Sequence, residues 1–290
     1  LLSMATTNAT APKSAPKKSQ GFTGIKSGFA VIIVCFLIAE CLYVFGAGHL
    51  SNFHAEGATG LPFHFFQDQS YEPAGIVGTV YKGGFIVPII WTLFITVIAL
   101  AIERAFAIGT ANGKGNLGKF AAAVKSALKQ GDLAKAEELC NKQKGSVANV
   151  VLAALTEYKK QQTTEVELEK KVLAIQKTVE EATALEMPMM HENLPIIGTI
   201  VTLGTLMGLL GTVMGMIKSF SAMAGGEGGA DSSALSVGIS EALVNTASGI
   251  ATGAAAVIAY NFFTNKIDRL TFAIDELGFT IVETFKTTQK

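Results

Sequence analysis

One acidic residue, Glu241, stands inside a long apolar stretch whose other polar side chains are uncharged. Asn245, Ser248 and Thr252 follow it at steps of four, three and four residues, so all four share one face of a helix. An ionisable side chain in lipid is costly, and polar groups that face hydrocarbon lack partners. We therefore expect this polar stripe to face protein or water, where a carboxyl group can exchange a proton.

The preceding apolar stretch carries glycines and threonines instead of acids. Thr205 and Thr212 lie seven residues apart on a common face, whereas Thr246, in the later stretch, sits on a different part of its helix from Glu241. Each hydroxyl could also bond back to a carbonyl of its own helix and have only a structural role. Small residues at helical spacing let membrane helices pack closely, so we expect a packing face and a contact between subunits at the glycines. These glycines are Gly204, Gly208, Gly211 and Gly215.

The composition indicates that membrane-spanning helices position these residues. Hydrophobic residues make up 49% of the 290 residues and charged residues 16%, and the mean hydropathy is +0.41. Soluble domains usually carry about 25% charged residues. Apolar runs at 29–45, 85–108, 194–220 and 233–263 are each long enough to be considered as a span. The sequence predicts an all-α membrane protein with about four transmembrane helices, whose long helices extend into a cytoplasmic helical domain.

The charges in the connecting segments predict the topology. Four lysines precede the first run and twelve lie in the charged region, whereas the first loop has one and the last turn none. Because basic residues favour the cytoplasmic side, we expect both termini in the cytoplasm and the loop and turn in the periplasm. Pro188 and Pro195 are expected to interrupt the helix that enters the membrane. The segments are a disordered tail (1–28), the loop (46–84), the helical domain (109–193), the turn (221–232) and a C-terminal helix (264–290).

The first apolar run has two interpretations. It could be a secretory signal that is cleaved, or a retained membrane anchor. We favour the anchor, because its length of about 17 residues exceeds the usual signal core of about 7–15 residues. Glu40 interrupts this run without Ser or Thr at helical spacing. We expect its carboxylate to reach the interface or bond to a neighbouring helix, and we consider proton handling there the weaker alternative.

Several function classes find no support in the sequence. His49, His54 and His64 match no metal-ligand spacing, and the three cysteines form no CxxC pair. The glycine-rich residues 225–229 lack the lysine and hydroxyl that follow in a phosphate-binding loop. A basic patch with interleaved aromatic residues is missing, so we expect no nucleic-acid partner. Because no nucleophile–base pair is found, we expect neither an enzyme nor a cofactor.

Two membrane motifs resemble those of the ExbB/TolQ proton-channel family, which is related more distantly to MotA. Residues 208–215 followed by Phe220 are similar to the family signature GLxGTVxGxxxxF. Residues 238–247 are similar to GIxEALxxTA, and residues 260–261 match a Tyr-Asn pair near the end of the family's last span. The resemblance covers roughly residues 85–285, and the two membrane motifs together are highly specific.

The resemblance implies an inner-membrane proton-channel subunit, most like ExbB of the TonB system. It implies a pentamer that encloses the transmembrane helices of a smaller, single-span ExbD-like partner, which supplies the essential membrane aspartate. Proton flow would move one ring relative to the other, and a TonB-like protein would pass the force to outer-membrane receptors. By position, the family's pore-lining threonines fall on Thr212 and Thr246, and its membrane glutamate falls on Glu241.

The sequence departs from the family pattern at two points, and alternatives remain. The run 29–45 is an extra span, and residues 254–256 are alanines where the family often has a proline. Within the family, a TolQ-like subunit or the stator of a surface motor is the alternative. From other classes, a small-solute secondary transporter would be expected to show internal repeats, which we do not find, and a structural scaffold would use the polar stripes only for packing.

Overall fold

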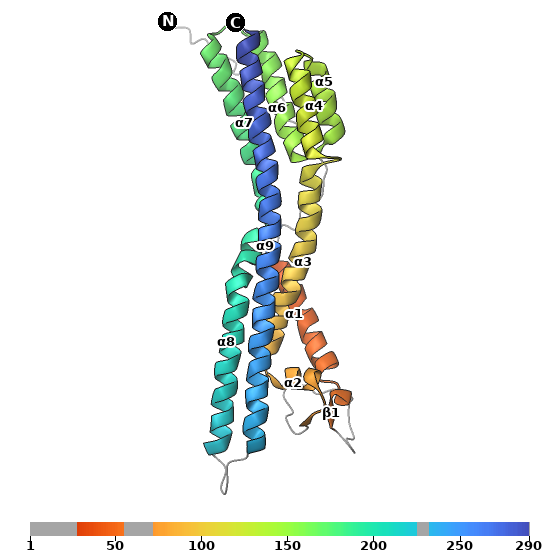
Figure 1. Ribbon diagram of the computed structural model, residues 1–290, viewed down its shortest axis with the longest axis vertical. Coiled ribbons are helices and arrows are strands. Elements are labelled where there is room, and N and C mark those ends of the chain that lie inside the picture. Colours follow the sequence, from red (N-terminus) through yellow and green to blue (C-terminus); the bar gives the residue numbers. More distant parts are fainter. Residues whose placement is uncertain (1–27, 55–71, 225–231, 290) are drawn as a thin grey trace, which may run out of the picture. The chain divides into compact units, whose positions relative to one another are not determined.

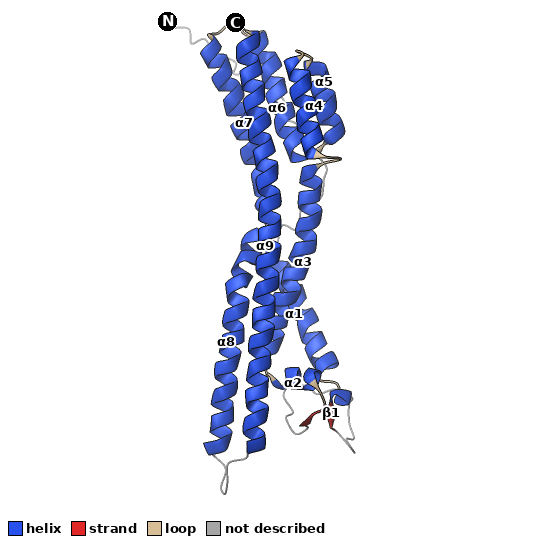
Figure 2. Cartoon of the chain, in the orientation of Figure 1, coloured by secondary structure: helices blue, strands red, loops and turns tan. Residues whose placement is uncertain are grey.

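The chain forms two compact units in the computed structural model, which describes residues 28–54, 72–224 and 232–289 (Figure 1). Among these described residues, 28–109 and 187–270, with their gaps, form the membrane unit, and 110–186 and 271–289 form the polar unit. Figure 2 shows that the described residues are mostly helical. Most of the predicted tail 1–28, His64 and the glycine-rich residues 225–229 lie outside the described residues.

In the part of the chain that the structure describes, four apolar helical segments are long enough to cross a membrane. They are Gly28–Ala47, Ile86–Lys129, Leu168–Ser221 and Gly238–Thr288, of which the second, third and fourth continue into the polar unit. The prediction of an all-α membrane protein with about four spanning helices is confirmed. The helices concerned are α1 (Gly28–Cys41), α3 (Ile86–Asn112), α7 (Leu168–His191), α8 (Leu194–Ala224) and α9 (Ser232–Thr288).

The end of the first span and the segment that follows it form a small lobe, which we call the outer lobe (described residues 42–54 and 72–83). A π-helical turn and a 3₁₀ turn lead into strand β1, which pairs antiparallel with β2, with Phe53 opposite Pro73 and His54 opposite Glu72. A short helix then leads to α3. The elements are Leu42–Ala47, Leu50–Asn52, β1 (Phe53–His54), β2 (Glu72–Pro73) and α2 (Ile76–Lys82).

All four spans contribute to one apolar core in the membrane unit. Val97 and Leu100 of α3 pack with Ile197 of α8 and Ala256 of α9, and Val31 of α1 packs against this cluster. At the start of α1, a Cβ on Gly28 would lie 2.8 Å from the Asn193 side-chain oxygen. The N-terminal segment is therefore a packed part of the membrane unit.

The polar unit is a set of shorter helices joined by capped turns. Asn116 accepts a hydrogen bond from the Lys119 amide at 3.1 Å, and Asp132 accepts one from the Lys135 amide at 2.9 Å. Such caps satisfy amide groups that have no partner inside the helix, which is why the helices begin there. The helices are α4 (Leu117–Lys129), α5 (Leu133–Gln143), α6 (Gly145–Gln162), the first part of α7 and the end of α9.

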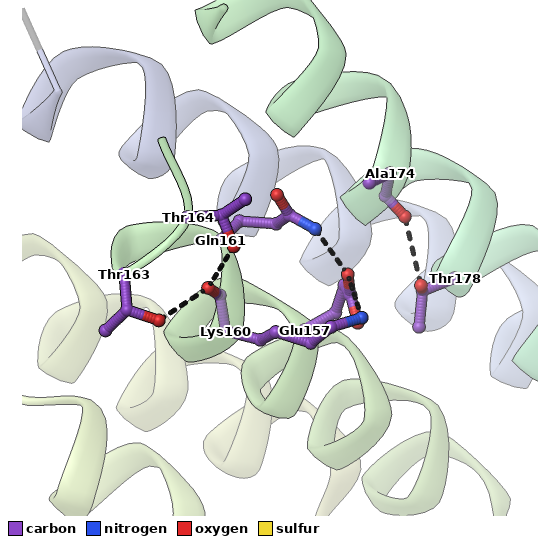
Figure 3. Close-up of polar contacts among 7 residues, drawn as sticks. All are labelled: Glu157, Lys160, Gln161, Thr163, Thr164, Ala174 and Thr178. Atoms are coloured by element: carbon purple, nitrogen blue, oxygen red, sulfur yellow. Dashed lines mark hydrogen bonds and ion pairs between the residues drawn. The ribbon is translucent and has the colours of Figure 1, made fainter. Parts of the chain in front are cut away.

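The C-terminal end of α6 shows how the next turn is made (Figure 3). The hydroxyls of Thr163 and Thr164 both donate to the carbonyl of Lys160, at 2.9 Å. Glu157 accepts from Lys160 at 3.2 Å and from Gln161 at 2.6 Å. The two threonine hydroxyls add donors to the Lys160 carbonyl, which also accepts from the Thr163 amide at 3.2 Å, while Glu157 joins side chains of the last turn.

The end of α9 packs into the polar unit. Phe285 is fully buried, and its ring meets the Tyr158 ring edge-on at a centroid distance of 4.8 Å. Lys125 of α4 forms an ion pair with Glu276. Helix α9 runs without interruption from the predicted fourth span, 233–263, through the predicted C-terminal helix, 264–290, as far as Thr288. The C-terminal helix is thus a continuation of the last span.

Candidate functional site

Helices α8 and α9 pack side by side in antiparallel register through their glycines (Figure 1). Gly208 and Gly249 mark the closest approach. A Cβ on Gly249 would lie 2.6 Å from the Gly204 carbonyl oxygen and 2.6 Å from Gly208 Cα, which is well inside normal contact distance. The two backbones can approach this closely only because both positions lack a side chain.

The rest of the glycine face also meets α9 of the same chain. The neighbouring helix of the same chain thus covers these glycines, and the contact between subunits that we expected there stays a prediction. A Cβ on Gly204 would lie 3.1 Å from Thr252 Cγ2, one on Gly211 would lie 2.5 Å from Asn245 Cβ, and one on Gly215 would lie 2.8 Å from Ala242 Cβ.

The threonine hydroxyls divide into two kinds. Thr246 donates across the helix pair to the Gly208 carbonyl at 3.0 Å. Thr212 donates to the Leu209 carbonyl of its own helix at 2.6 Å. The structure thus brings Thr246 to within about one helical turn of Thr212 along α8. Thr205 and Thr252 bond back to carbonyls of their own helices, Val201 at 3.3 Å and Ser248 at 2.9 Å respectively.

Thr212 opens onto a shallow groove along the outside of α8. Apart from two hydroxyls, the side chains of this groove are apolar. Such a surface suits another transmembrane helix, because the hydroxyls are the polar points on an otherwise apolar face. The groove is lined by Thr212, Val213, Met216, Ile217, Phe220 and Ser221.

Glu241 lies away from that groove and inside the membrane unit. It is 5% exposed, and its Oε2 lies 3.8 Å from Nζ of Lys218 on α8. The positive charge of Lys82, the last residue of α2, also acts on it. The sequence analysis did not identify Lys218 as a partner of Glu241. Its position could have indicated this role, because it is the one basic residue of the apolar run 194–220.

The polar stripe on α9 is turned towards neighbouring helices. Asn245 and Thr252 are buried, and Ser248 is half-buried. The Asn245 side chain donates from Nδ2 to the Gly83 carbonyl at 3.1 Å, while its Oδ1 is buried without a hydrogen bond. The amide therefore connects α9 to the corner between α2 and α3.

A second buried polar cluster lies where α7 ends and α8 begins. Arg104 is fully buried and forms a two-pronged ion pair with Glu103, with Nε 2.6 Å from Oε2. Its Nη1 donates to the Met189 carbonyl at 3.0 Å and lies 3.5 Å from the Met190 carbonyl. Asn193, which has a φ of +63°, lies within 3.5 Å of Glu103. This cluster satisfies carbonyls of the last turn of α7, and sequence reasoning had not identified it as a site.

The two prolines expected to interrupt this helix have different positions. Pro188 lies inside α7, and Pro195 lies in the first turn of α8, where a missing amide is tolerated. The break falls between them, after His191. It coincides with the contacts of Arg104 described above.

The histidines of the outer lobe have local structural contacts. The His49 ring accepts a hydrogen bond from the Ser51 amide at 3.2 Å, and His54 of strand β1 lies opposite Glu72 of strand β2. In the described part of the chain, His, Cys, Asp and Glu side chains form no group of three that could hold a metal ion.

Comparison with known proteins places the motifs in a family. Residues 143–276 match the model of the MotA/TolQ/ExbB proton channel family, and this match includes both membrane motifs. The chain is 40% identical over 86 residues to the biopolymer transport protein ExbB-like 3 of Synechocystis sp., over 29% of this chain and 41% of that protein. It is 42% identical over 79 residues to the biopolymer transport protein ExbB of Helicobacter pylori, over 27% and 54% of the two chains. The aligned regions thus span about half or less of each relative's length.

Proposed function

We propose that this chain is the proton-channel subunit of an ExbB–ExbD-type motor, because residues 143–276 match the model of the MotA/TolQ/ExbB proton channel family and part of the chain is similar to two ExbB-type proteins. Such a motor converts the proton gradient across the inner membrane into mechanical work on a TonB-like protein, which drives import through the outer membrane. The observation that carries this proposal is the placement of Thr212 and Thr246 about one turn apart on a tightly packed helix pair.

The two hydroxyls supply the chemistry that a proton path needs. A hydroxyl both donates and accepts hydrogen bonds, so with water it can pass a proton along a chain of such bonds. The Thr246 hydroxyl donates its hydrogen bond to the Gly208 carbonyl, and its oxygen can still accept one. Thr212 lies beside the apolar groove, where a partner helix that carries an acidic residue would bring a proton acceptor into reach.

We assign the proton carrier itself to that partner. Glu241 is buried away from the groove, with its Oε2 3.8 Å from Lys218 Nζ, so we expect it to support the path from outside the groove. The partner would be a single-span, ExbD-like protein, and several copies of this chain, five by the family resemblance, would surround its transmembrane helices. The groove on α8 is the surface that we propose for that contact.

We place the protein in the inner membrane with both termini in the cytoplasm. The lysine distribution supports this orientation, because the polar unit is rich in lysine and the segments 46–84 and 221–232 are nearly free of it. In this arrangement the polar unit is cytoplasmic, and the outer lobe lies at the periplasmic end. The run 29–45 is then a retained span, as its packing against the core suggests.

Two experiments test this function. The first isolates the intact complex from membranes and identifies its partners. An ExbD-like, single-span partner with a membrane aspartate, together with a TonB-like protein, is expected. A partner that serves envelope integrity or a surface motor would favour the TolQ-like or stator alternative. Solute uptake without any such partner would favour a secondary transporter.

The second experiment tests the proton path. The double variant Thr212→Val and Thr246→Val keeps the side-chain shapes and removes both hydroxyls, so proton flux into proteoliposomes should be lost while the complex still assembles. Thr199→Val is the matched control, because this exposed threonine of α8 bonds only to the Pro195 carbonyl one turn earlier among the hydrogen bonds described. Wild-type flux in the double variant would refute the assignment.

A further inference from the structure

We propose that Asn245 is a positioning residue through which the N-terminal helix and the outer lobe hold Glu241 in place. This inference rests on the proposed function. It assigns a role to the extra N-terminal segment and to Asn245, and a contiguous series of contacts carries it.

The first contact joins the end of the N-terminal span to α2. The Tyr43 hydroxyl donates to the Tyr81 carbonyl, and the two rings stack at a centroid distance of 4.8 Å. Phe53 meets Tyr81 edge-on at 5.7 Å. All three aromatic side chains are buried, at 2–6% exposure. A Cβ on Gly48 would lie 2.7 Å from the Tyr81 ring, so the π-helical end of the span and α2 form one tightly packed body.

The second contact joins this body to α9. Gly83 directly follows α2, and its carbonyl accepts the hydrogen bond from Asn245 Nδ2 at 3.1 Å. The fit is close, because a Cβ on Gly83 would lie 2.6 Å from Asn245 Oδ1. Asn245 is only 2% exposed, so water does not compete freely for this bond. Asn245 therefore joins α9 to the outer lobe through a buried hydrogen bond.

The third step leads from Asn245 to Glu241. The two residues are four apart on α9 and lie on the same face, one above the other. Lys82, adjacent to Gly83, acts on Glu241 from the lobe, and Lys218 acts on it from α8. The positive charges that act on Glu241 thus come from α2 and α8.

The consequence is that the surroundings of Glu241 depend on the lobe, which carries Lys82, as well as on Lys218 of α8. If the Asn245 amide is removed, the outer half of α9 is free to shift relative to α2, and the distance from Glu241 to Lys82 changes with it. A change in the distance to a charged group alters how readily a carboxyl group releases its proton.

The test uses the whole complex in liposomes and follows the infrared carboxyl band of Glu241 during a pH titration. The band is identified by its loss in Glu241→Gln. Asn245→Ala should change the proton affinity of Glu241 by up to roughly fivefold, because the coupling cannot exceed the value of the one net hydrogen bond to Gly83 that carries it. Gly83→Ala, which pushes a methyl group against Asn245 Oδ1, should change it in the same direction. Gly46→Ala, whose Cβ would meet no atom within 4 Å, is the control in the same lobe and should leave it unchanged.

The outcomes separate this inference from the proposed function. An unchanged Glu241 titration in both Asn245→Ala and Gly83→Ala would overturn the positioning role. If Asn245→Ala does not fold, Gly83→Ala decides alone, because the Asn245 amide is still present there. A wild-type complex that conducts no protons would refute the proposed function, whereas the Glu241 titration would still report whether Asn245 positions this carboxyl group.

Discussion

The buried pair of Arg104 and Glu103 allows a quantitative prediction about the membrane unit. Arg104→Met keeps an apolar side chain of similar length and removes the guanidinium. Glu103, 4% exposed, would then keep its charge without that partner, and the carbonyls of Met189 and Met190 would lose their donor. The helix break between α7 and α8 is the region that should loosen.

The magnitude follows from these lost contacts. Removing one partner of a buried ion pair typically costs about 3–5 kcal/mol, because an uncompensated charge stays behind. We expect Arg104→Met to lower the free energy of unfolding by about this amount. In the double variant with Glu103→Gln no buried charge remains. The combined loss should therefore be smaller than the sum of the two single losses, by about 2 kcal/mol.

The assay is unfolding in mixed micelles of increasing denaturing-detergent content, followed by helical circular dichroism, for the wild type, the two single variants and the double variant. Arg269→Met is the matched control, because Arg269 is exposed and its loss should change the unfolding free energy by less than about 0.5 kcal/mol. Equal effects of Arg104→Met and Arg269→Met would refute the reasoning. So would strict additivity of the two single variants.

Three further predictions concern packing and pH. Gly249→Ala should destabilise the packing of α8 on α9 by about 1–3 kcal/mol in the same assay, because the added methyl group overpacks the contact. Gly109→Ala lies in α3, where the added Cβ would meet no atom within 4 Å, and should stabilise the protein by up to about 1 kcal/mol. A change of the same sign in both variants would contradict this. Phe285→Ala should lower the free energy of unfolding of the polar unit by about 3–5 kcal/mol, and Phe279→Ala, at a residue 70% exposed on the same helix, should have little effect in thermal unfolding. Burial raises the pKa of the Cys140 thiol from 9.0 to about 12, so the stability linked to this thiol is complete below about pH 9 and is lost as the pH rises towards 12. Unfolding measured between about pH 8 and pH 11 should therefore depend more steeply on pH in the wild type than in Cys140→Ala, and equal slopes would count against a protonated buried thiol.

The sequence by itself indicated the all-α membrane class, the approximate number of segments long enough to span a membrane, and the similarity to the proton-channel family. These properties depend on local patterns. Apolar runs of sufficient length predict spans wherever they occur, and the motifs at 208–215 and 238–247 are contiguous. Helical spacing also placed Glu241, Asn245 and Thr252 on one face before any contact was known.

Only the tertiary structure decided which partners these residues have. The glycine face predicts close packing, but the spacing alone does not say which helix covers it, and α9 of the same chain does so. Thr246 reaches Gly208, and Asn245 reaches Gly83 across 162 residues of sequence. Glu241 lies 3.8 Å from Lys218, a residue that the length of the apolar run 194–220 does not single out. A periodic pattern specifies the direction of a side chain around its own helix, whereas its partner depends on how distant segments pack together.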